Sequence, residues 1–252
     1  MTHFSNSMKK PQVVGILGGM GPAAGADFAR LFVRACADHL RASGQVVSDQ
    51  GFPEHWLAQV PVPDRSAALD APGLGAHQPL EPMLQALSKL AALGATTIAV
   101  ACNTAHAWHG ALQQRFPQLE LLHVAREVAA SLAKGGVREV GLLATGGTYR
   151  AGLYDQALRA AGVQCHVPQP EEQDALMHGI YQGVKVGNLA LAQTRFTQVA
   201  EALARRHGLS TLVLGCTEIP LALKSVPGLD ALALVDPAAV LARALAHRAY
   251  AV

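Results

Sequence analysis

The sequence predicts an α/β fold: two pseudo-symmetric α/β domains with mainly parallel sheets, and an active site in the cleft between the domains. Short apolar runs alternate with helical patterns along the 252 residues. Half of the residues are apolar and only 15% are charged, which is typical of a well-buried globular chain. One order of strand, turn and helix occurs twice. Strands that alternate with helices are typical of a parallel sheet covered on both faces.

Composition and charge exclude several classes of protein. The formal net charge is +2 and no run of Lys or Arg is present, so we expect no nucleic-acid partner. The apolar stretches are only strand-length and are broken by glycine, so we expect no membrane partner. Residues 1–10 are polar and lack the apolar segment of an export signal, which favours a cytoplasmic location.

The first half of the chain reads as two strand-and-turn units. Residues 13–17 predict a buried strand that ends in the glycine turn 18–21. Pro22 suits the first position of the helix that follows. This helix is expected to place on one face Phe28, Leu31, Phe32, Ala35 and His39.

The second unit of this half begins with a helix whose apolar residues recur from Leu80 to Ala91 and which Gly94 ends. Residues 97–101 predict a short buried strand. That strand runs directly into Cys102, Asn103 and Thr104.

The second half repeats this order. Residues 137–144 predict a strand, which a turn at 145–148 and a helix to about Ala161 follow. Asn188 is expected to cap a long helix that stops at Gly208.

The chain then closes with two strands and a last helix. Residues 211–214 predict a strand that runs into Gly215, Cys216 and Thr217. Residues 232–235 predict a final strand, after which Asp236 caps a helix that begins at Pro237.

The repeated order predicts two similar lobes. We expect one lobe to comprise residues 1–123 and 231–252 and to carry Cys102, and the other to comprise 124–230 and to carry Cys216. Active sites of parallel sheets lie beyond the carboxyl ends of the strands, where both cysteines fall.

The four cysteines are Cys36, Cys102, Cys165 and Cys216, and they form no CxxC pair. Cys102 and Cys216 each follow an apolar strand and precede an expected helix N-terminus, which would lower a thiol pKa from about 8.5. The other two cysteines are expected in the core. The histidines have no HxxxH or HExxH spacing, so no metal site is predicted.

At this point a family resemblance becomes specific. Ala101-Cys102-Asn103-Thr104-Ala105-His106 and Gly215-Cys216-Thr217-Glu218-Ile219-Pro220 resemble the paired motifs of the aspartate/glutamate racemase family. The turns within 15–22 and 142–148 resemble two further motifs of that family. The resemblance implies two-base chemistry at Cys102 and Cys216, no cofactor, no metal and a homodimer, and it is closest to aspartate racemase.

The chemistry of racemisation calls for two acid–base groups, and two thiols can supply them. Inversion of an α-carbon requires that one group remove a proton and that a second group supply one on the opposite face. One thiolate and one thiol, one per lobe, can do this and exchange roles with the direction of the reaction. The carbanion also needs hydrogen-bond donors at the α-carboxylate, each worth about 3–4 kcal/mol in the barrier.

The marked turns supply candidates for these donors. Ordinary helix capping is a compatible second role for Asn103, Thr104 and Thr217. The candidate substrate-binding residues of the turns are Met20, Asn103, Thr104, Thr145, Gly146, Thr148, Thr217 and Glu218.

Two basic residues are expected to determine the substrate specificity of the site, for which we expect a small amino-acid dicarboxylate. The segment 61–65 resembles the part of aspartate racemases whose Arg, here Arg65, contacts the side-chain carboxylate. The segment 179–185 resembles the part that supplies the matching lysine, Lys185. A guanidinium can read a carboxylate through two hydrogen bonds. Glutamate racemases usually carry histidine where this chain has Glu218, which favours aspartate.

Other interpretations stay open beside this one. A glutamate or broad-specificity racemase, a hydantoin racemase, a maleate-type isomerase and a decarboxylase share the fold. A decarboxylase is expected to keep only one of the two cysteines. A dinucleotide enzyme would need glycine at Ala24, whereas the glycine comes one residue late at Gly25. A non-catalytic anion-binding module would bind the ligand without exchanging its α-proton. His106, beside Cys102, has either a structural or a functional role.

Overall fold

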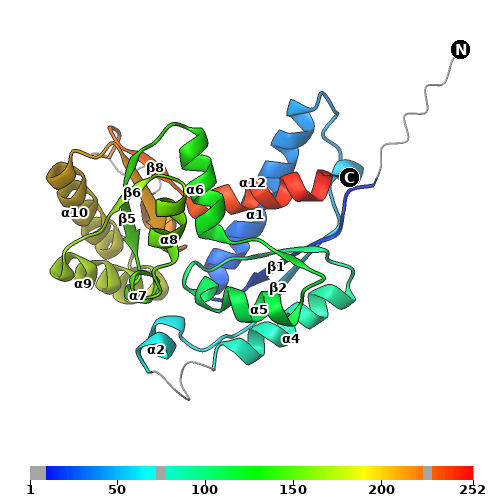
Figure 1. The fold of residues 1–252 in the computed structure, drawn as a ribbon, viewed down its shortest axis with the longest axis horizontal. Coiled ribbons are helices and arrows are strands. Elements are labelled where there is room, and N and C mark those ends of the chain that lie inside the picture. The colour runs from blue at the N-terminus through cyan, green and yellow to red at the C-terminus, as the bar shows by residue number, and fades with distance from the viewer. Residues whose placement is uncertain (1–9, 72–77, 224–228, 252) are drawn as a thin grey trace, which may run out of the picture.

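The computed structural model describes residues 10–71, 78–223 and 229–251 and confirms the α/β class. Two four-stranded sheets, in the orders β2-β1-β3-β4 and β6-β5-β7-β8, form the two lobes of Figure 1. Every strand pairing is parallel. The strands are β1 (Val14–Gly18), β2 (His55–Gln59), β3 (Thr97–Val100), β4 (Glu120–Leu121), β5 (Glu139–Ala144), β6 (Gln164–His166), β7 (Thr211–Gly215) and β8 (Ala233–Val235).

The two sheets have the same topology, which confirms the repeat that the sequence indicates. In each lobe the first strand, β1 or β5, is central, the second lies at one edge and the third pairs on the other side. Leu17 of β1 is in register with Val100 of β3, and Ala144 of β5 with Gly215 of β7. Because parallel strands end at one edge, the residues after β3 and β7 emerge at the carboxyl ends of their sheets.

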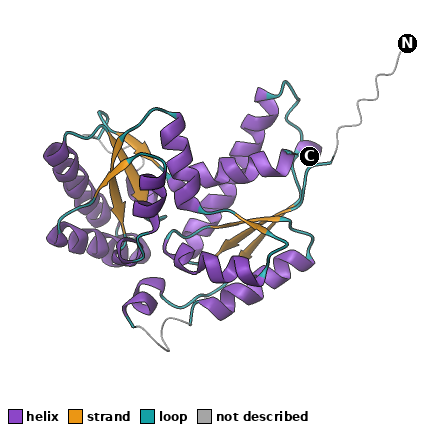
Figure 2. Ribbon diagram, in the orientation of Figure 1, coloured by secondary structure: helices purple, strands orange, loops and turns teal. Residues whose placement is uncertain are grey.

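Helices cover both faces of each sheet (Figure 2). Around the first sheet lie η1 (Asp49–Gly51), α1 (Pro22–Ala42), α2 (Arg65–Asp70), α4 (Leu80–Ala92), η2 (Thr104–Trp108), α5 (His109–Arg115) and α12 (Pro237–Tyr250). Around the second lie α6 (Val124–Lys134), α7 (Gly146–Arg150), α8 (Leu153–Ala160), α9 (Pro170–His178), η3 (Gly179–Gly183), η4 (Val184–Val186), α10 (Leu189–His207) and α11 (Ile219–Leu223).

The end of the chain crosses between the lobes. β8 pairs with β7, so the second sheet extends beyond the boundary expected at residue 230. α12 then returns to the first lobe, where Leu241 and Leu245 share a buried cluster with Phe28 and Phe32 of α1. The chain therefore passes between the lobes twice, at the segment before α6 and between β8 and α12 (Figure 1).

The predicted caps of the long helices are confirmed. The Asp236 carboxylate accepts a hydrogen bond from the amide of Ala238 at 2.9 Å, and Pro237 opens α12. The Asn188 side chain accepts one from the amide of Leu191 at 3.2 Å. α10 ends at Gly208, whose φ of 64° lies in the left-handed region that glycine adopts without steric cost.

The helix expected from the turn at 145–148 to about Ala161 is wrong as one element. The structure divides it into α7 and α8 at Gly152, whose φ of 60° breaks the helical path. Glycine at this position allows the chain to turn, and the turn sets the direction of α8.

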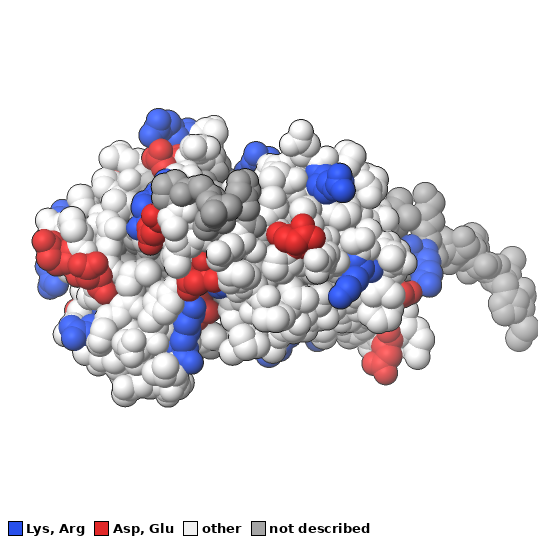
Figure 3. Space-filling view, turned by 90° about the horizontal axis from the view of Figure 1, so that it is seen from below, with Lys and Arg blue, Asp and Glu red and all other residues white. Residues whose placement is uncertain are grey.

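The surface agrees with the modest net charge. On the face in Figure 3, Lys and Arg side chains lie apart from one another, interspersed with Asp and Glu over a largely uncharged surface. Across the described ranges, no helix combines the length and the apolar character that crossing a membrane requires.

Candidate active site

Both predicted catalytic cysteines line one cavity at the carboxyl ends of the two sheets. Cys102 comes just after β3 and Cys216 directly after β7, and both side chains are buried. The cavity is narrow and partly open to solvent, and the space that the centre of a water molecule can occupy is about 20 Å³. Its walls are formed by Met20, Asp64, Arg65, Ser66, Cys102, Asn103, Thr104, Thr145, Ile180, Tyr181, Lys185, Cys216, Thr217 and Glu218.

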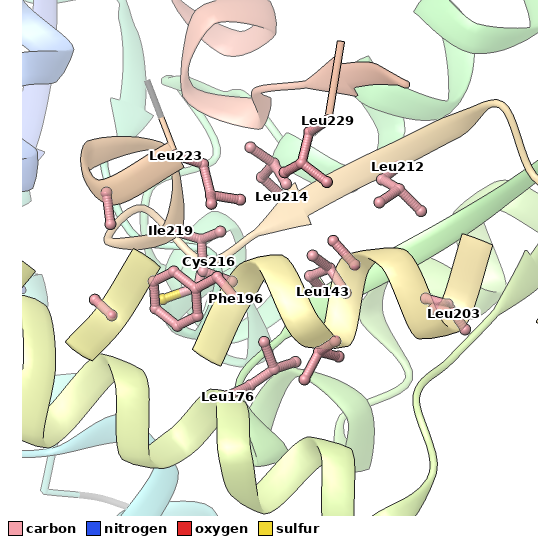
Figure 4. Close-up of a cluster of buried hydrophobic side chains, with 14 of the residues drawn as sticks. Leu143, Leu176, Phe196, Leu203, Leu212, Leu214, Cys216, Ile219, Leu223 and Leu229 are labelled. Carbon is pink, nitrogen blue, oxygen red and sulfur yellow. The ribbon is translucent and has the colours of Figure 1, made fainter. Parts of the chain in front are cut away.

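Cys216 lies between the cavity and the core of its lobe. Figure 4 shows it at the end of the buried cluster that includes Phe196 and Ile219. Its Sγ donates a hydrogen bond to Oε2 of the buried Glu218 at 3.0 Å, and the Thr217 hydroxyl donates to the same oxygen at 3.2 Å. Burial and the adjacent carboxylate raise the pKa of Cys216 well above its ordinary value.

Cys102 has a different electrostatic environment. Burial raises its pKa, but the positive charge of the Arg65 guanidinium opposes that rise. The expectation that helix N-termini lower both thiol pKa values is therefore wrong. The elements after the cysteines are the short η2 and α11, and desolvation in the buried turns outweighs their effect.

Arg65 is held mainly by the backbone. Its Nη1 donates to the carbonyls of Val62 and Pro63, each at 3.0 Å, and its Nη2 donates to that of Met20 at 2.8 Å. Its Nε is buried and has no hydrogen-bond partner within the described residues. The guanidinium therefore brings a fixed positive charge to the cavity wall, and the backbone engages three of its five N–H groups. Two hydrogen bonds from Arg65 to a carboxylate of the substrate remain a prediction.

Lys185 lies in an interlobe cluster at the same cavity. The Tyr181 hydroxyl donates to Oδ2 of Asp64 at 2.7 Å, and Lys185 Nζ lies 4.0 Å from that oxygen. Lys185 Nζ is also 4.2 Å from the centroid of the Tyr181 ring. Burial raises the pKa of Asp64, but hydrogen bonds from the Ala67 amide and Tyr181, with the nearby positive charges, lower it overall. Asp64 belongs to the first lobe and the other two to the second, so this cluster joins the lobes.

Three threonine hydroxyls form a second link between the lobes. Thr104 Oγ1 lies 2.9 Å from Thr145 Oγ1 and 3.0 Å from Thr148 Oγ1, and the latter two are 3.1 Å apart. Thr104 and Thr145 line the cavity, and the buried Thr148 lies against both of them. Gly146, a further predicted residue, donates its N–H to the thioether sulfur of Met177 at 3.4 Å.

Asn103 does not act as the helix cap that its position suggests. It precedes η2, but its side chain makes no capping hydrogen bond there. Its Oδ1 instead accepts a hydrogen bond from the hydroxyl of Tyr154 at 2.5 Å. The capping interpretation of Asn103 is wrong because a partner from the other lobe engages the side chain.

His106 has a structural contact with the turn that carries Cys102. Its Nδ1 donates to the carbonyl of Cys102 at 2.9 Å and lies 3.2 Å from that of Asn103. Burial lowers the pKa of His106 to about 4, so the ring is neutral near pH 7. These contacts favour the structural role over the functional one.

Sequence reasoning did not single out four residues of the wall: Asp64, Ser66, Ile180 and Tyr181. Three of them, Asp64, Ile180 and Tyr181, lie inside the segments already marked for Arg65 and Lys185. Asp64 directly precedes Arg65, and Tyr181 lies one helical turn before Lys185. The segments that resemble the family were thus the available signal for these residues. No spacing rule could have paired the carboxylate of Asp64 with Tyr181, because the two residues lie far apart in the sequence.

Fold and site together define a class: two-lobed α/β proteins in which matching turns of two sheets bring a cysteine each to one cavity. Comparison with known sequences is consistent with this class, because the family described as Asp/Glu/Hydantoin racemase matches residues 17–245. The chain belongs to that family.

Solved structures resemble the whole chain. The aspartate racemase of Picrophilus torridus is 28% identical, with a TM-score of 0.76 and 94% of each chain covered. An aspartate racemase homologue from Pyrococcus horikoshii is 26% identical, with a TM-score of 0.71, 95% of this chain and 99% of that chain covered.

Relatives found by sequence are named for substrates other than aspartate. The glutamate racemase of Ectopseudomonas mendocina is 34% identical over 164 residues, which are 62% of this chain and 59% of that protein. The match thus spans less than two thirds of that relative. The broad specificity amino-acid racemase RacX of Bacillus subtilis is 23% identical over 236 residues, covering 92% of this chain and 95% of that protein.

Proposed function

We propose that this chain is a cofactor-independent amino-acid racemase that interconverts L- and D-aspartate. The observation that carries the proposal is that Cys102 and Cys216, supplied by equivalent turns of two lobes, line the same cavity. Two thiols in such a place can serve the two faces of one α-carbon.

The proposed reaction moves one proton in each of two steps. A thiolate takes the α-proton and becomes a thiol. The electron pair of the broken C–H bond remains on the substrate as a carbanion delocalised into the α-carboxylate. The opposite thiol then gives its proton to the other face and becomes the thiolate. Protons and charge balance, and a proton returned by solvent exchange or by the reverse reaction restores the starting form.

The charges around the cavity support different protonation states for the two cysteines before the reaction begins. The positive charge of Arg65 would stabilise a thiolate at Cys102, whereas the thiol of Cys216 donates a hydrogen bond to Glu218. We therefore infer that Cys102 loses its proton more readily than Cys216, so that a single thiolate in the cavity lies at Cys102 and Cys216 stays a thiol. Reaction of the enantiomer that uses the opposite order begins from the less stable arrangement.

Donors for the α-carboxylate come from the two turns. Asn103, Thr104 and Thr145 line the cavity, and each can donate a hydrogen bond to an enediolate-like oxygen. Loss of one such donor is expected to cost about 3–4 kcal/mol in the barrier.

Arg65 and Lys185 favour a substrate with a second carboxylate. Asp64 already lies near Lys185, so a carboxylate of the substrate would take the place of Asp64 as the partner of that lysine. The similarity to the Picrophilus aspartate racemase over 94% of both chains supports aspartate. The glutamate racemases and RacX support a second candidate, a glutamate or broad-specificity racemase.

The test is incubation of the purified protein with L-aspartate in D2O. We expect D-aspartate that carries deuterium at the α-carbon, detected by chiral chromatography with mass spectrometry. Parallel reactions with glutamate, neutral amino acids, hydantoins and maleate measure the specificity. A protein that exchanges no α-proton would overturn the racemase proposal, and a covalent maleate adduct with turnover would favour an isomerase. Light scattering of the same sample tests the expected homodimer.

A further inference from the structure

Tyr154 reaches from the second lobe to the turn that carries Cys102. It lies at the start of α8, its side chain is 1% exposed, and its hydroxyl donates to Oδ1 of Asn103 at 2.5 Å. Asn103 follows Cys102 directly and lines the cavity. A buried tyrosine outside the cavity wall therefore contacts a residue of that wall.

The surroundings of Tyr154 fix its ring. The ring packs in a buried cluster with Val128, Leu158 and Val213 of its own lobe. Burial raises the pKa of Tyr154 well above its ordinary value, so the hydroxyl keeps its proton and acts as a donor. A donor in a rigid position needs an acceptor, and here the acceptor is the amide carbonyl of Asn103.

An amide has a carbonyl at one end and two N–H donors at the other. If the amide of Asn103 rotated by half a turn, its NH2 group would donate to the hydroxyl oxygen of Tyr154, and the proton of the buried hydroxyl would lose the carbonyl that now accepts it. In the observed arrangement the carbonyl faces Tyr154, and this leaves the NH2 end available to the cavity that Asn103 lines.

We propose that Tyr154 is a positioning residue, which holds the carbonyl of Asn103 so that the amide N–H groups face the α-carboxylate of the substrate. The inference rests on the proposed racemase function. Since the two residues belong to different lobes, the orientation depends on the lobes being together. The adjacent Thr104 is held across the lobes by Thr145 and Thr148 in the same way.

A double-mutant cycle tests this inference. Tyr154→Phe removes only the hydroxyl and is expected to lower kcat/KM for L-aspartate about tenfold, mainly through kcat, while Asn103→Ala lowers it about a hundredfold. Because Tyr154 acts through Asn103, the double variant should be no slower than Asn103→Ala alone. Asn103→Asp adds a second test: it still accepts from Tyr154 but has no N–H to donate, so its activity should fall as in Asn103→Ala.

Tyr149→Phe is the matched control. The Tyr149 hydroxyl donates to the carbonyl of Leu142 at 3.0 Å and accepts from the amide of Ala144 at 2.8 Å, so it supports the same lobe without touching Asn103. If Tyr149→Phe lowers kcat/KM, it should lower it by the same factor in the native protein and in the Asn103→Ala variant. Thermal unfolding of every variant accompanies the kinetics.

Two outcomes would overturn the inference while the racemase proposal stands. One is a Tyr154→Phe enzyme with native kcat/KM. The other is a loss on Tyr154→Phe that multiplies undiminished in the Asn103→Ala background. A native protein without racemase activity would instead overturn the proposed function, and this inference with it.

Discussion

The thiol of Cys216 donates a hydrogen bond to Glu218, with 3.0 Å between Sγ and Oε2. The equivalent thiol of the other lobe, Cys102, lies near the guanidinium of Arg65 instead. The two lobes share one topology, but Glu218 accepts a hydrogen bond from one thiol, whereas the positive charge of Arg65 lies near the other. The symmetry of the fold therefore does not extend to the electrostatics of the site.

Glu218→Gln should make the two thiols more alike. The carboxylate raises the pKa of Cys216, so its replacement by a neutral amide should lower that pKa, although burial still keeps it elevated. The pH dependence of alkylation of Cys216, measured in the Cys102→Ser background, should shift to lower pH. We expect kcat for one enantiomer to fall at least tenfold more than for the other. An unchanged alkylation profile would contradict the assigned role of Glu218.

Substitution of each thiol should separate the two half-reactions. Cys102→Ser and Cys216→Ser are each expected to reduce racemisation by about a thousandfold, because a serine hydroxyl is a poor acid and base near pH 7. Each variant should keep more α-proton exchange in D2O with one enantiomer, and the favoured enantiomer should differ between them. Native rates in both variants would refute the two-thiol mechanism.

Arg65→Ala should weaken binding of dicarboxylates more than that of neutral amino acids. The variant loses the positive charge at the cavity wall and the hydrogen bonds to the carbonyls of Met20, Val62 and Pro63. We expect KM for aspartate to rise about ten- to a hundredfold. Arg150→Ala is the control, since it removes an exposed ion pair with Asp70, worth at most about 1 kcal/mol. Equal effects on aspartate and alanine would show that Arg65 does not read the side-chain carboxylate.

His106 should make the fold sensitive to acid. Its pKa is lowered to about 4 in the folded protein from an unfolded value of 6.5, so folding favours the neutral ring. The stabilisation is complete above pH 6.5 and is lost as the pH falls toward 4, by about 3 kcal/mol. His106→Asn, which can still donate to the backbone but does not titrate, should flatten this dependence. Denaturant unfolding at several pH values measures it, and parallel curves for the two proteins would contradict the prediction.

Much of the fold could be read along the chain. Apolar runs of strand length, glycine turns and caps such as Asp236 and Asn188 are local signals, and the structure confirms them. The repeated order of elements also indicated that Cys102 and Cys216 occupy equivalent turns. Parallel strands end at a common edge, so a residue just after a strand is already placed by the topology.

The two α/β lobes and the two thiols at the ends of their strands could be predicted from the order of residues, because periodicity and turn chemistry are local properties. The contacts between side chains emerged with the folded structure: Tyr154 meets Asn103, and Tyr181 meets Asp64. It also reversed the expected direction of the cysteine pKa shifts, since desolvation depends on everything packed around a thiol. Contacts between distant segments and burial are properties of the folded chain, and no short motif contains them.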